Sequence, residues 1–218
     1  EIKLMKRVIL LSALIIGMFS NAAFSADWEL QATNDTLGIE IYTREVTDSD
    51  FLEYRGVTRV NTGLKPVVAL IADVDAAPKW MFNMISSKTV KVYSQHEDIV
   101  YSLNESGPLI ADRDSVVRSI LTQDEESKVV TIKMTNEPTF IPEVDGIVRI
   151  SELNGIWKLT PQEDGVTEVE YQMYVDPAGD LPAGIVNAFV VDEPLHTLTG
   201  MHQHIGFYHD TPVPYISD

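Results

Sequence analysis

Apolar residues recur at two different spacings along the chain, and the change between them separates a strand-rich segment from a long final helix. Between residues 39 and 176, short runs with an apolar residue at every second position are typical of strands with one buried face. Over residues 180–205 the apolar positions recur every three or four residues, as on one face of a helix. Such a helix has to bury its apolar face on the sheet, which predicts an α+β fold with the last helix laid across the strands.

The first part of the mature chain is expected to contain a hairpin and a short helix. The runs 39–46 and 52–60 are rich in strand-forming residues, and the polar stretch between them predicts a hairpin. Apolar spacing over residues 64–74, with Pro66 in the first turn, predicts a helix. A second short helix is expected to begin at Pro78.

A meander of antiparallel strands is expected to follow, because short polar connections separate the next apolar runs. The predicted strands are residues 90–94, 99–103, 113–121, 128–135, 147–153, 156–160 and 168–175. Asn154-Gly155 predicts a tight hairpin turn between two of them. Alternating side chains then give the sheet one apolar face and one polar, solvent-exposed face.

The final helix contains two prolines with different expected effects. Asp180 is expected to cap the helix, and Pro182 is tolerated in its first turn. Pro194 lies inside the apolar stripe, where it lacks an N–H donor and its ring collides with the carbonyl near Val190, so we expect a bend or a break. The C-terminal tail, residues 206–218, is expected to be a loosely held extension.

The first 25 residues have the pattern of a secretory signal peptide. Met5-Lys6-Arg7 provides a positive start, and small residues precede a cleavage site at Ser25. The apolar run 8–19 is shorter than the roughly 20 residues that span a bilayer. We expect translation to start at Met5, after four extra residues, and cleavage to release a periplasmic or secreted protein. An uncleaved membrane anchor is the alternative.

Charge and composition narrow the range of partners. The chain has 16 basic and 33 acidic residues, a net charge of −17, and loss of residues 1–25 would leave 13 − 32 = −19. Such a charge repels phosphate backbones and anionic headgroups, which argues against nucleic acid and tight electrostatic membrane attachment. The absence of cysteine excludes thiol catalysis and cysteine-based metal sites. The length suits one domain.

Few polar residues form a pattern that supports catalysis or metal binding. Neighbouring strand residues point to opposite faces, so Asp112, Arg113 and Asp114 are interpreted as a turn or a strand-start ion pair rather than an acid–base group. His202 and His204 would lie about 200° apart on a helix and could not share a metal. We expect no metal, no cofactor and no enzymatic activity.

Several short motifs, taken together in their order, resemble the START family of StAR-related lipid-transfer domains. They are DW (27–28), FLEYRGV (51–57), DV (73–74), PKW (78–80), PLIADRD (108–114), GIVRI (146–150), GIWKLTP (155–161), DPAG (176–179) and LP (181–182). The resemblance covers residues 26–205. It implies a helix-grip fold, in which a curved antiparallel sheet holds a C-terminal helix over an apolar tunnel for one lipid or sterol-like molecule.

Periodicity alone cannot distinguish a packed core from a cavity, whereas the resemblance favours the cavity. In sterol-binding members an arginine lies six residues beyond the Arg-Asp pair, and here that position is Ser119. We therefore expect a neutral site built on hydroxyl groups. The expected ligand contacts follow from the alternation of side chains along each strand and from the corresponding positions in the family. They are Tyr101, Ser102, Ser119, Ile132, Met134, Arg149, Tyr171, Met173, Ile185 and Phe189. Arg149 is expected either to pair with an acid or to contact the ligand.

Three functions remain open from the sequence. The first is a monomeric carrier that binds a lipid or another hydrophobic small molecule and contacts membranes transiently. The second is an enzyme on the same scaffold, similar to aromatase/cyclases, and the third is a cavity-free domain that binds a protein through the last helix. The loop 137–143, with Phe140 and Ile141 between prolines, is expected either to touch a bilayer or to pack onto the last helix.

Overall fold

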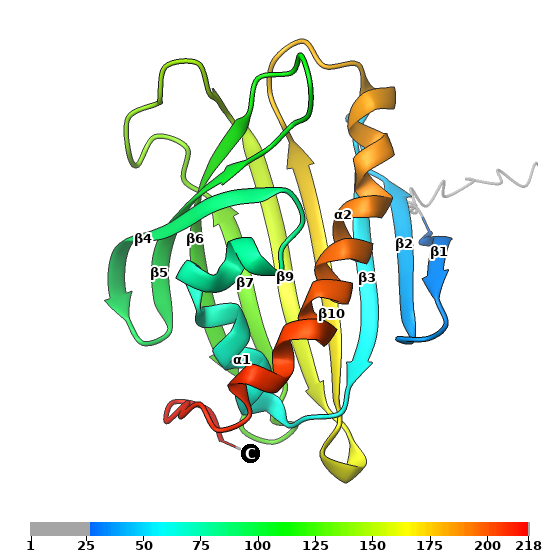
Figure 1. The fold of residues 1–218 in the computed structure, drawn as a ribbon, viewed down its shortest axis with the longest axis vertical. Coiled ribbons are helices and arrows are strands. Elements are labelled where there is room, and N and C mark those ends of the chain that lie inside the picture. The colour runs from blue at the N-terminus through cyan, green and yellow to red at the C-terminus, as the bar shows by residue number, and fades with distance from the viewer. Residues whose placement is uncertain (1–26, 218) are drawn as a thin grey trace, which may run out of the picture.

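The protein consists of one curved antiparallel sheet with helices against one of its faces (Figure 1). The computed structural model describes residues 27–217, so the predicted signal peptide, residues 1–25, lies outside the described residues. Within the described part, no helix has both the length and the apolar character that a bilayer crossing requires. The expected α+β class, with the last helix laid across the strands, is confirmed.

Ten strands form the sheet. They are β1 (Glu29–Asn34), β2 (Ile39–Glu45), β3 (Leu52–Val60), β4 (Met84–Ser94), β5 (Glu97–Asn104), β6 (Arg113–Gln123), β7 (Val130–Asn136), β8 (Val148–Arg149), β9 (Glu152–Pro161) and β10 (Thr167–Asp176). The spatial order is β1-β2-β3-β10-β9-β7-β6-β5-β4, and β8 pairs in parallel with β6. Pairing of β10 with β3 joins the N-terminal strands to the later meander.

The helices largely follow the predicted pattern. They are α1 (Leu64–Ala72), α2 (Ala183–His204) and the short 3-10 turns η1 (Val74–Lys79), η2 (Glu163–Gly165) and η3 (Ile205–Tyr208). The second short helix therefore begins before Pro78, where the Asp73 side chain accepts a hydrogen bond from the backbone of Ala76. Asp180 does not cap α2, because Pro182 occupies the N-cap position. The helix continues through Pro194 without a break (Figure 1).

The predicted hairpin turn at Asn154-Gly155 is wrong. Both residues lie inside β9, which pairs with β10 on one side and β7 on the other. A Cβ atom at Gly155 would lie 2.9 Å from the Gln172 carbonyl oxygen and 3.0 Å from Met134 Cε. Glycine is therefore required by close packing inside the sheet rather than by a turn.

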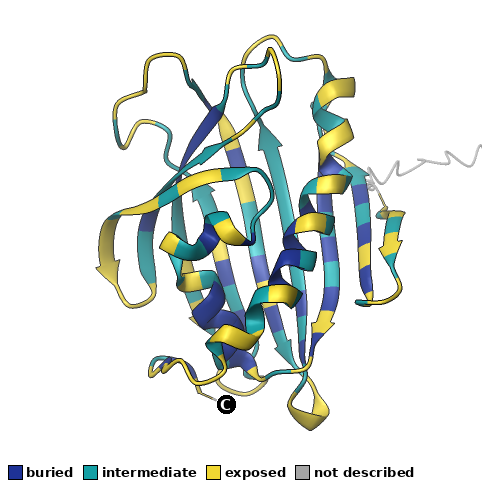
Figure 2. Cartoon of the chain, in the orientation of Figure 1, coloured by how far each residue is buried: buried dark blue, intermediate teal, exposed yellow. Residues whose placement is uncertain are grey.

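The hydrophobic core lies between α1, the C-terminal half of α2 and the strands beneath them (Figure 2). Trp157 and Tyr171 are almost fully buried, and their rings stack with centroids 3.9 Å apart. Leu70 of α1 and Leu198 and Met201 of α2 are also inaccessible to solvent. Burying each aliphatic side chain stabilises the fold by about 1.5–3 kcal/mol. This cluster fixes both helices against the sheet.

Two glycines allow the C-terminal half of α2 to pack closely. A Cβ atom at Gly200 would lie 2.1 Å from the Trp80 carbonyl oxygen, and one at Gly56 of β3 would lie 2.7 Å from Leu198 Cδ1. Near the N-terminus of α2, in contrast, Ile185 and Phe189 are 41% and 42% exposed. The helix is thus tightly packed at one end and loosely covered at the other.

The C-terminal tail packs against the protein, so the prediction of a loosely held extension is wrong. Val213 and Ile216 are each 3% exposed and belong to the core cluster. The backbone N–H of Ser217 donates to Gln123 Oε1, and Gln123 Nε2 donates to the Ser217 carbonyl. Two apolar side chains and this reciprocal pair hold the tail.

The edge strands of the sheet are irregular. The pairing of β1 with β2 has one register shift, between Leu30 and Ala32. The pairing of β4 with β5 has three register shifts within eleven residues, and Lys88 and Lys91 lie along this edge strand. Such irregularities bend a strand and interrupt its hydrogen-bonding ladder.

We predict that Gly200→Ala destabilises the protein by about 3 kcal/mol, although alanine normally favours a helix. The added methyl group would collide with the Trp80 carbonyl, a backbone group that cannot rotate away. Urea unfolding measures the change. Gly184→Ala is the matched control in the same helix, because nothing lies within 4 Å of its Cβ position, and it should change stability by about 1 kcal/mol or less. Equal effects of the two substitutions would contradict the packing argument.

Candidate functional site

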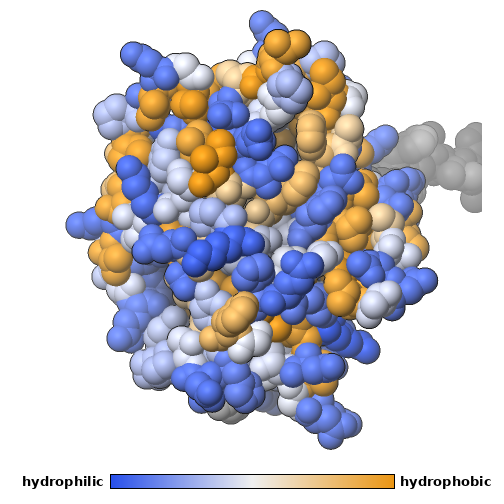
Figure 3. All heavy atoms as spheres, in the orientation of Figure 1, coloured by the Kyte–Doolittle hydropathy of each residue, from blue (hydrophilic) through white to orange (hydrophobic). Residues whose placement is uncertain are grey.

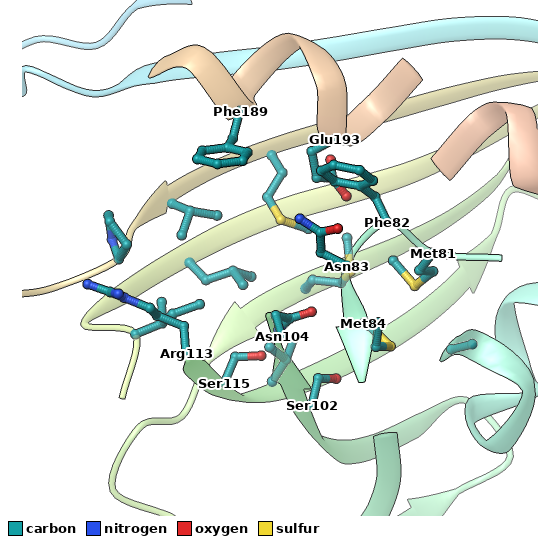
Figure 4. A pocket seen from close by; sticks show the side chains of 18 of the residues that line it. Met81, Phe82, Asn83, Met84, Ser102, Asn104, Arg113, Ser115, Phe189 and Glu193 are labelled. Carbon is teal, nitrogen blue, oxygen red and sulfur yellow. The ribbon is translucent and has the colours of Figure 1, made fainter. Parts of the chain in front are cut away.

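A cavity of about 350 Å³ lies between the sheet and the N-terminal half of α2. Strands β3, β5, β6, β7, β9 and β10 form its floor, and η1, the residues that follow it and α2 cover it. Figure 4 shows side chains from these elements converging on the same space. Most of the lining side chains are apolar, including Trp80, Met134 and Phe189. The cavity-free alternative is therefore wrong.

Most of the predicted ligand contacts line this cavity. Eight of the ten do so, namely Ser102, Ser119, Ile132, Met134, Tyr171, Met173, Ile185 and Phe189. The six on strands share the inner face of the sheet, whereas Ile185 and Phe189 come from α2. That these residues contact a ligand stays a prediction.

Arg149 does not line the cavity, and the first of its two expected roles is correct. Its Nε donates to Asp114 Oδ1 at 2.6 Å, and both side chains are buried. The remaining guanidinium nitrogens donate to Asp114 Oδ2 and to the carbonyls of Pro138, Ile141 and Pro142. The hydrogen bonds that Arg149 donates to Asp114 raise the pKa of Arg149 despite burial. Arg149 therefore holds the loop 137–147 against β6.

Tyr101 does not line the cavity either, contrary to the prediction. It precedes Ser102 in β5, and neighbouring strand residues point to opposite faces. The Lys88 ammonium lies 5.1 Å from the centre of the Tyr101 ring. Burial and the nearby Asp114 carboxylate raise the pKa of Tyr101. Of the hydroxyl groups proposed for a neutral site, only those of the two serines face the cavity.

Four polar side chains lie together on the mostly apolar floor, and we call them the polar patch. It consists of Asn104 and Ser102 of β5 and of Arg113 and Ser115 of β6, which pair directly as Asn104 with Arg113 and Ser102 with Ser115. Figure 4 shows the four side chains on the cavity side of these strands. The sequence interpretation missed Arg113, although it lies six residues before Ser119 and so shares its face.

Arg113 is a buried cation, and no carboxylate within residues 27–217 forms an ion pair with it. Its Nη1 donates to the Ala111 carbonyl at 2.6 Å, and its Nη2 lies 3.5 Å from the Ala178 carbonyl. The Nε atom is buried without a hydrogen-bond partner, and the residue is only 7% exposed. Desolvation lowers the pKa of Arg113, and the nearby Asp112 opposes this. Arginine nevertheless stays protonated in proteins, so a positive charge faces the cavity.

Glu193 of α2 contributes a second ionisable group to the cavity, on the helix side of the space (Figure 4). Tyr171 Oη and Thr197 Oγ1 each donate to its Oε1 at 3.3 Å, while its Oε2 is buried without a partner. Burial raises the pKa of Glu193 to about 7, although hydroxyl groups including that of Tyr54 oppose the shift. The carboxyl group therefore changes charge near neutral pH.

Apolar side chains are exposed around one end of the cavity. Ile110 and Leu181 line the cavity from the loops 105–112 and 177–182. Leu109, beside Ile110, is fully exposed, and Phe140 is 40% exposed at the tip of the loop that Arg149 holds. These loops and the N-terminus of α2 lie at the same end of the molecule (Figure 1), where Figure 3 shows hydrophobic surface. We call this end the mouth.

We predict that Glu193 makes the folded state less stable as the pH rises. The unfolded chain releases this proton near pH 4.5 and the folded protein near pH 7. The contribution of Glu193 to the free energy of unfolding is therefore fully present below pH 4.5 and falls by up to about 3 kcal/mol by pH 7. Glu193→Gln should remove this loss, so the variant should gain stability over the original protein between pH 5 and 8.

Urea unfolding at pH 5 and pH 8 tests this pH dependence. Asp192→Asn is the matched control, because Asp192 is the exposed neighbour of Glu193 on the same helix. It should show the same pH dependence as the original protein. An unchanged pH dependence in Glu193→Gln would show that the carboxyl group titrates normally.

Comparison with known proteins identifies the family to which the chain belongs. A family model described as the START domain matches residues 20–204. An uncharacterised protein of Pseudomonas aeruginosa is 34% identical over 195 residues, which cover 89% of this chain and 94% of that protein. The crystal structure of a StAR-related lipid transfer protein from Xanthomonas axonopodis is similar with a TM-score of 0.76 and 30% identity, over 82% of this chain and 98% of that one. Human StAR-related lipid transfer protein 5, at 18% identity, shares the fold with a TM-score of 0.75 over 85% of this chain and 89% of its own. The chain belongs to the START domain family.

Proposed function

We propose that this protein is an exported, non-catalytic carrier that encloses one hydrophobic ligand between the sheet and α2. The main support is the cavity of about 350 Å³, which apolar side chains line on both the sheet side and the helix side. The names of the similar proteins from Xanthomonas axonopodis and human, which are lipid transfer proteins, agree with such a role.

An apolar tail supplies enough free energy for this kind of binding. Each buried methylene contributes about 0.8 kcal/mol, so a chain of about 12 methylenes contributes roughly 10 kcal/mol before the costs of association. No covalent bond to the ligand is needed. A few polar groups then suffice to orient the head of the ligand.

Export is part of the proposal and is supported by the sequence pattern of residues 1–25. A mature chain with a charge of −19 would be repelled by anionic headgroups, so contact with a membrane would be brief. Brief contact suits a protein that has to leave a membrane after loading. The exposed Leu109 and Phe140 at the mouth are the side chains that we propose to touch the bilayer.

An enzyme on the same scaffold is the competing proposal, and Glu193 is the observation that favours it. A carboxyl group with a pKa of about 7, hydrogen-bonded to Tyr171 in an enclosed site, has the properties of a general acid or base. The two proposals differ in what happens to the ligand. A carrier releases it with unchanged mass, whereas an enzyme releases a different compound, and mass spectrometry of the released ligand distinguishes them.

We predict that filling the cavity abolishes ligand capture. Ser119→Phe places a ring into the cavity from β6 and should reduce the lipid extracted from labelled vesicles by about tenfold or more. Native mass spectrometry measures the bound ligand. Ile120→Phe is the matched control, because Ile120 is the next residue of the strand and is exposed on the outer face. Equal extraction by both variants would contradict binding in the cavity.

We also predict that polar substitutions at the mouth slow transfer without affecting the bound state. Leu109→Ser and Phe140→Ser remove exposed apolar area and should together lower the rate of lipid transfer between vesicles several-fold. Fluorescence dequenching of a labelled lipid measures the rate. Leu30→Ser changes an exposed leucine on β1, away from the mouth, and should transfer at the original rate. Equal rates in all variants would argue against membrane contact through these loops.

A further inference from the structure

We propose that the polar patch is an oxyanion site and that the ligand is therefore an amphiphile with one carboxylate or phosphate head. This inference rests on the proposed carrier function and specifies the chemical class of the ligand. It replaces the neutral, hydroxyl-based site expected from the sequence.

The unused hydrogen-bond donors of Arg113 are the first argument. A guanidinium group has five N–H donors, and in this structure only the Ala111 and Ala178 carbonyls accept hydrogen bonds from it. A buried charge without a counter-charge is costly, and carboxylates and phosphates match the planar guanidinium with two parallel hydrogen bonds. An oxyanion in the cavity would supply the missing counter-charge.

The arrangement of the other three side chains is the second argument. Directly opposed residues of an antiparallel pair have Cβ atoms about 5 Å apart, and successive residues on one face lie about 7 Å apart. Asn104, Ser102 and Ser115 therefore surround an area about the size of a carboxylate or phosphate group. Within the part of the chain that the structure describes, their side chains form no hydrogen bond with another protein group. Each can donate to an oxyanion.

The acidic residues near the polar patch are the third consideration. Asp114 points to the outer face of β6, where Arg149 neutralises it. The Asp112 carboxylate accepts a hydrogen bond from the Ser106 backbone, and Glu105 is solvent-exposed although it touches the cavity. Glu193 lies across the cavity on α2 (Figure 4). None of these acids pairs with Arg113, so its charge remains available for one anion.

The apolar floor beyond the polar patch has room for the tail of the same molecule. Ile132 and Met134 of β7, Trp157 of β9 and Met173 of β10 continue the floor from β6, and Phe189 covers it from α2 (Figure 4). A head held at Arg113 therefore directs an aliphatic chain along these strands, beneath the helix.

Three probes with the same chain test the head group, namely dodecanoate, dodecyl phosphate and dodecan-1-ol. Their affinities are measured by calorimetry at pH 8, where both acids are ionised. We expect at least one anion to bind about tenfold or more tightly than the alcohol, because hydrogen bonds between charged groups are stronger than neutral ones. The anion that binds more tightly identifies a fatty-acid-like or a phospholipid-like head.

Arg113→Gln should weaken anion binding about tenfold or more and leave dodecan-1-ol binding within about twofold. Arg118→Gln is the matched control, because Arg118 lies on the same strand, faces outward and pairs with Glu97. It should bind all three probes like the original protein. Asn104→Leu keeps the buried arginine and should still weaken anion binding several-fold, which provides a test if Arg113→Gln does not fold.

The outcomes separate this inference from the carrier proposal. If the alcohol binds as tightly as both anions and neither Arg113→Gln nor Asn104→Leu alters anion binding, the oxyanion site is refuted while the carrier proposal stands. If none of the three probes binds and vesicle extraction also fails, the carrier proposal is refuted, and the oxyanion site with it.

Discussion

The close contact between the C-terminal half of α2 and the backbone around Trp80 is the constraint on which the rest of the structure depends. Gly200 and Gly56 lack the side chains that would otherwise hold the helix away, so this half packs closely against Trp80 and β3. The helix is continuous, and at 22 residues it is about 33 Å long. The cavity lies beneath the N-terminal half of the helix, where Ile185 and Phe189 remain partly exposed.

Alternation along β6 explains how a charged group comes to face an apolar cavity. Arg113 and Asp114 are adjacent, so the strand directs one charge inward and the other outward. The outward carboxylate is neutralised by Arg149, whose remaining donors hold the loop with Phe140. The same alternation that prevents Asp114 from pairing with Arg113 thus ties the loop at the mouth to the strand that contributes the polar patch. Strand β6 therefore contributes side chains to the cavity and, through Asp114 and Arg149, holds a loop of the mouth in place.

The sequence predicted those features that depend on neighbouring residues and missed those that depend on distant ones. Most of the strands and the final helix followed from periodicity, because the burial of one face is a local property of each element. The strand β1 and the first half of β4 were not predicted, and the strand expected at residues 147–153 is only the two-residue β8 and the start of β9. The turn expected at Gly155 failed because the reason for glycine there is Met134 and Gln172, which belong to other strands. Because every second residue of a strand shares a face, the expected inward position of Ser119 also predicts that Arg113 faces inward. The adjacent Asp112 and Asp114 led instead to the interpretation of Arg113 as part of an ion pair. The two tail residues, Val213 and Ile216, were too few to form a pattern.

The irregular edges of the sheet affect the tendency of the protein to aggregate through pairing of its edge strands with other chains. The strand order ends in β1 and β4, so the sheet never closes into a barrel, and both rims carry unpaired peptide groups. Regular, flat edge strands recruit strands from other molecules and promote fibril growth. The bulges in β4 and the charges of Lys88 and Lys91 make that rim a poor template. The sheet can therefore stay open without the aggregation hazard that an open sheet ordinarily brings.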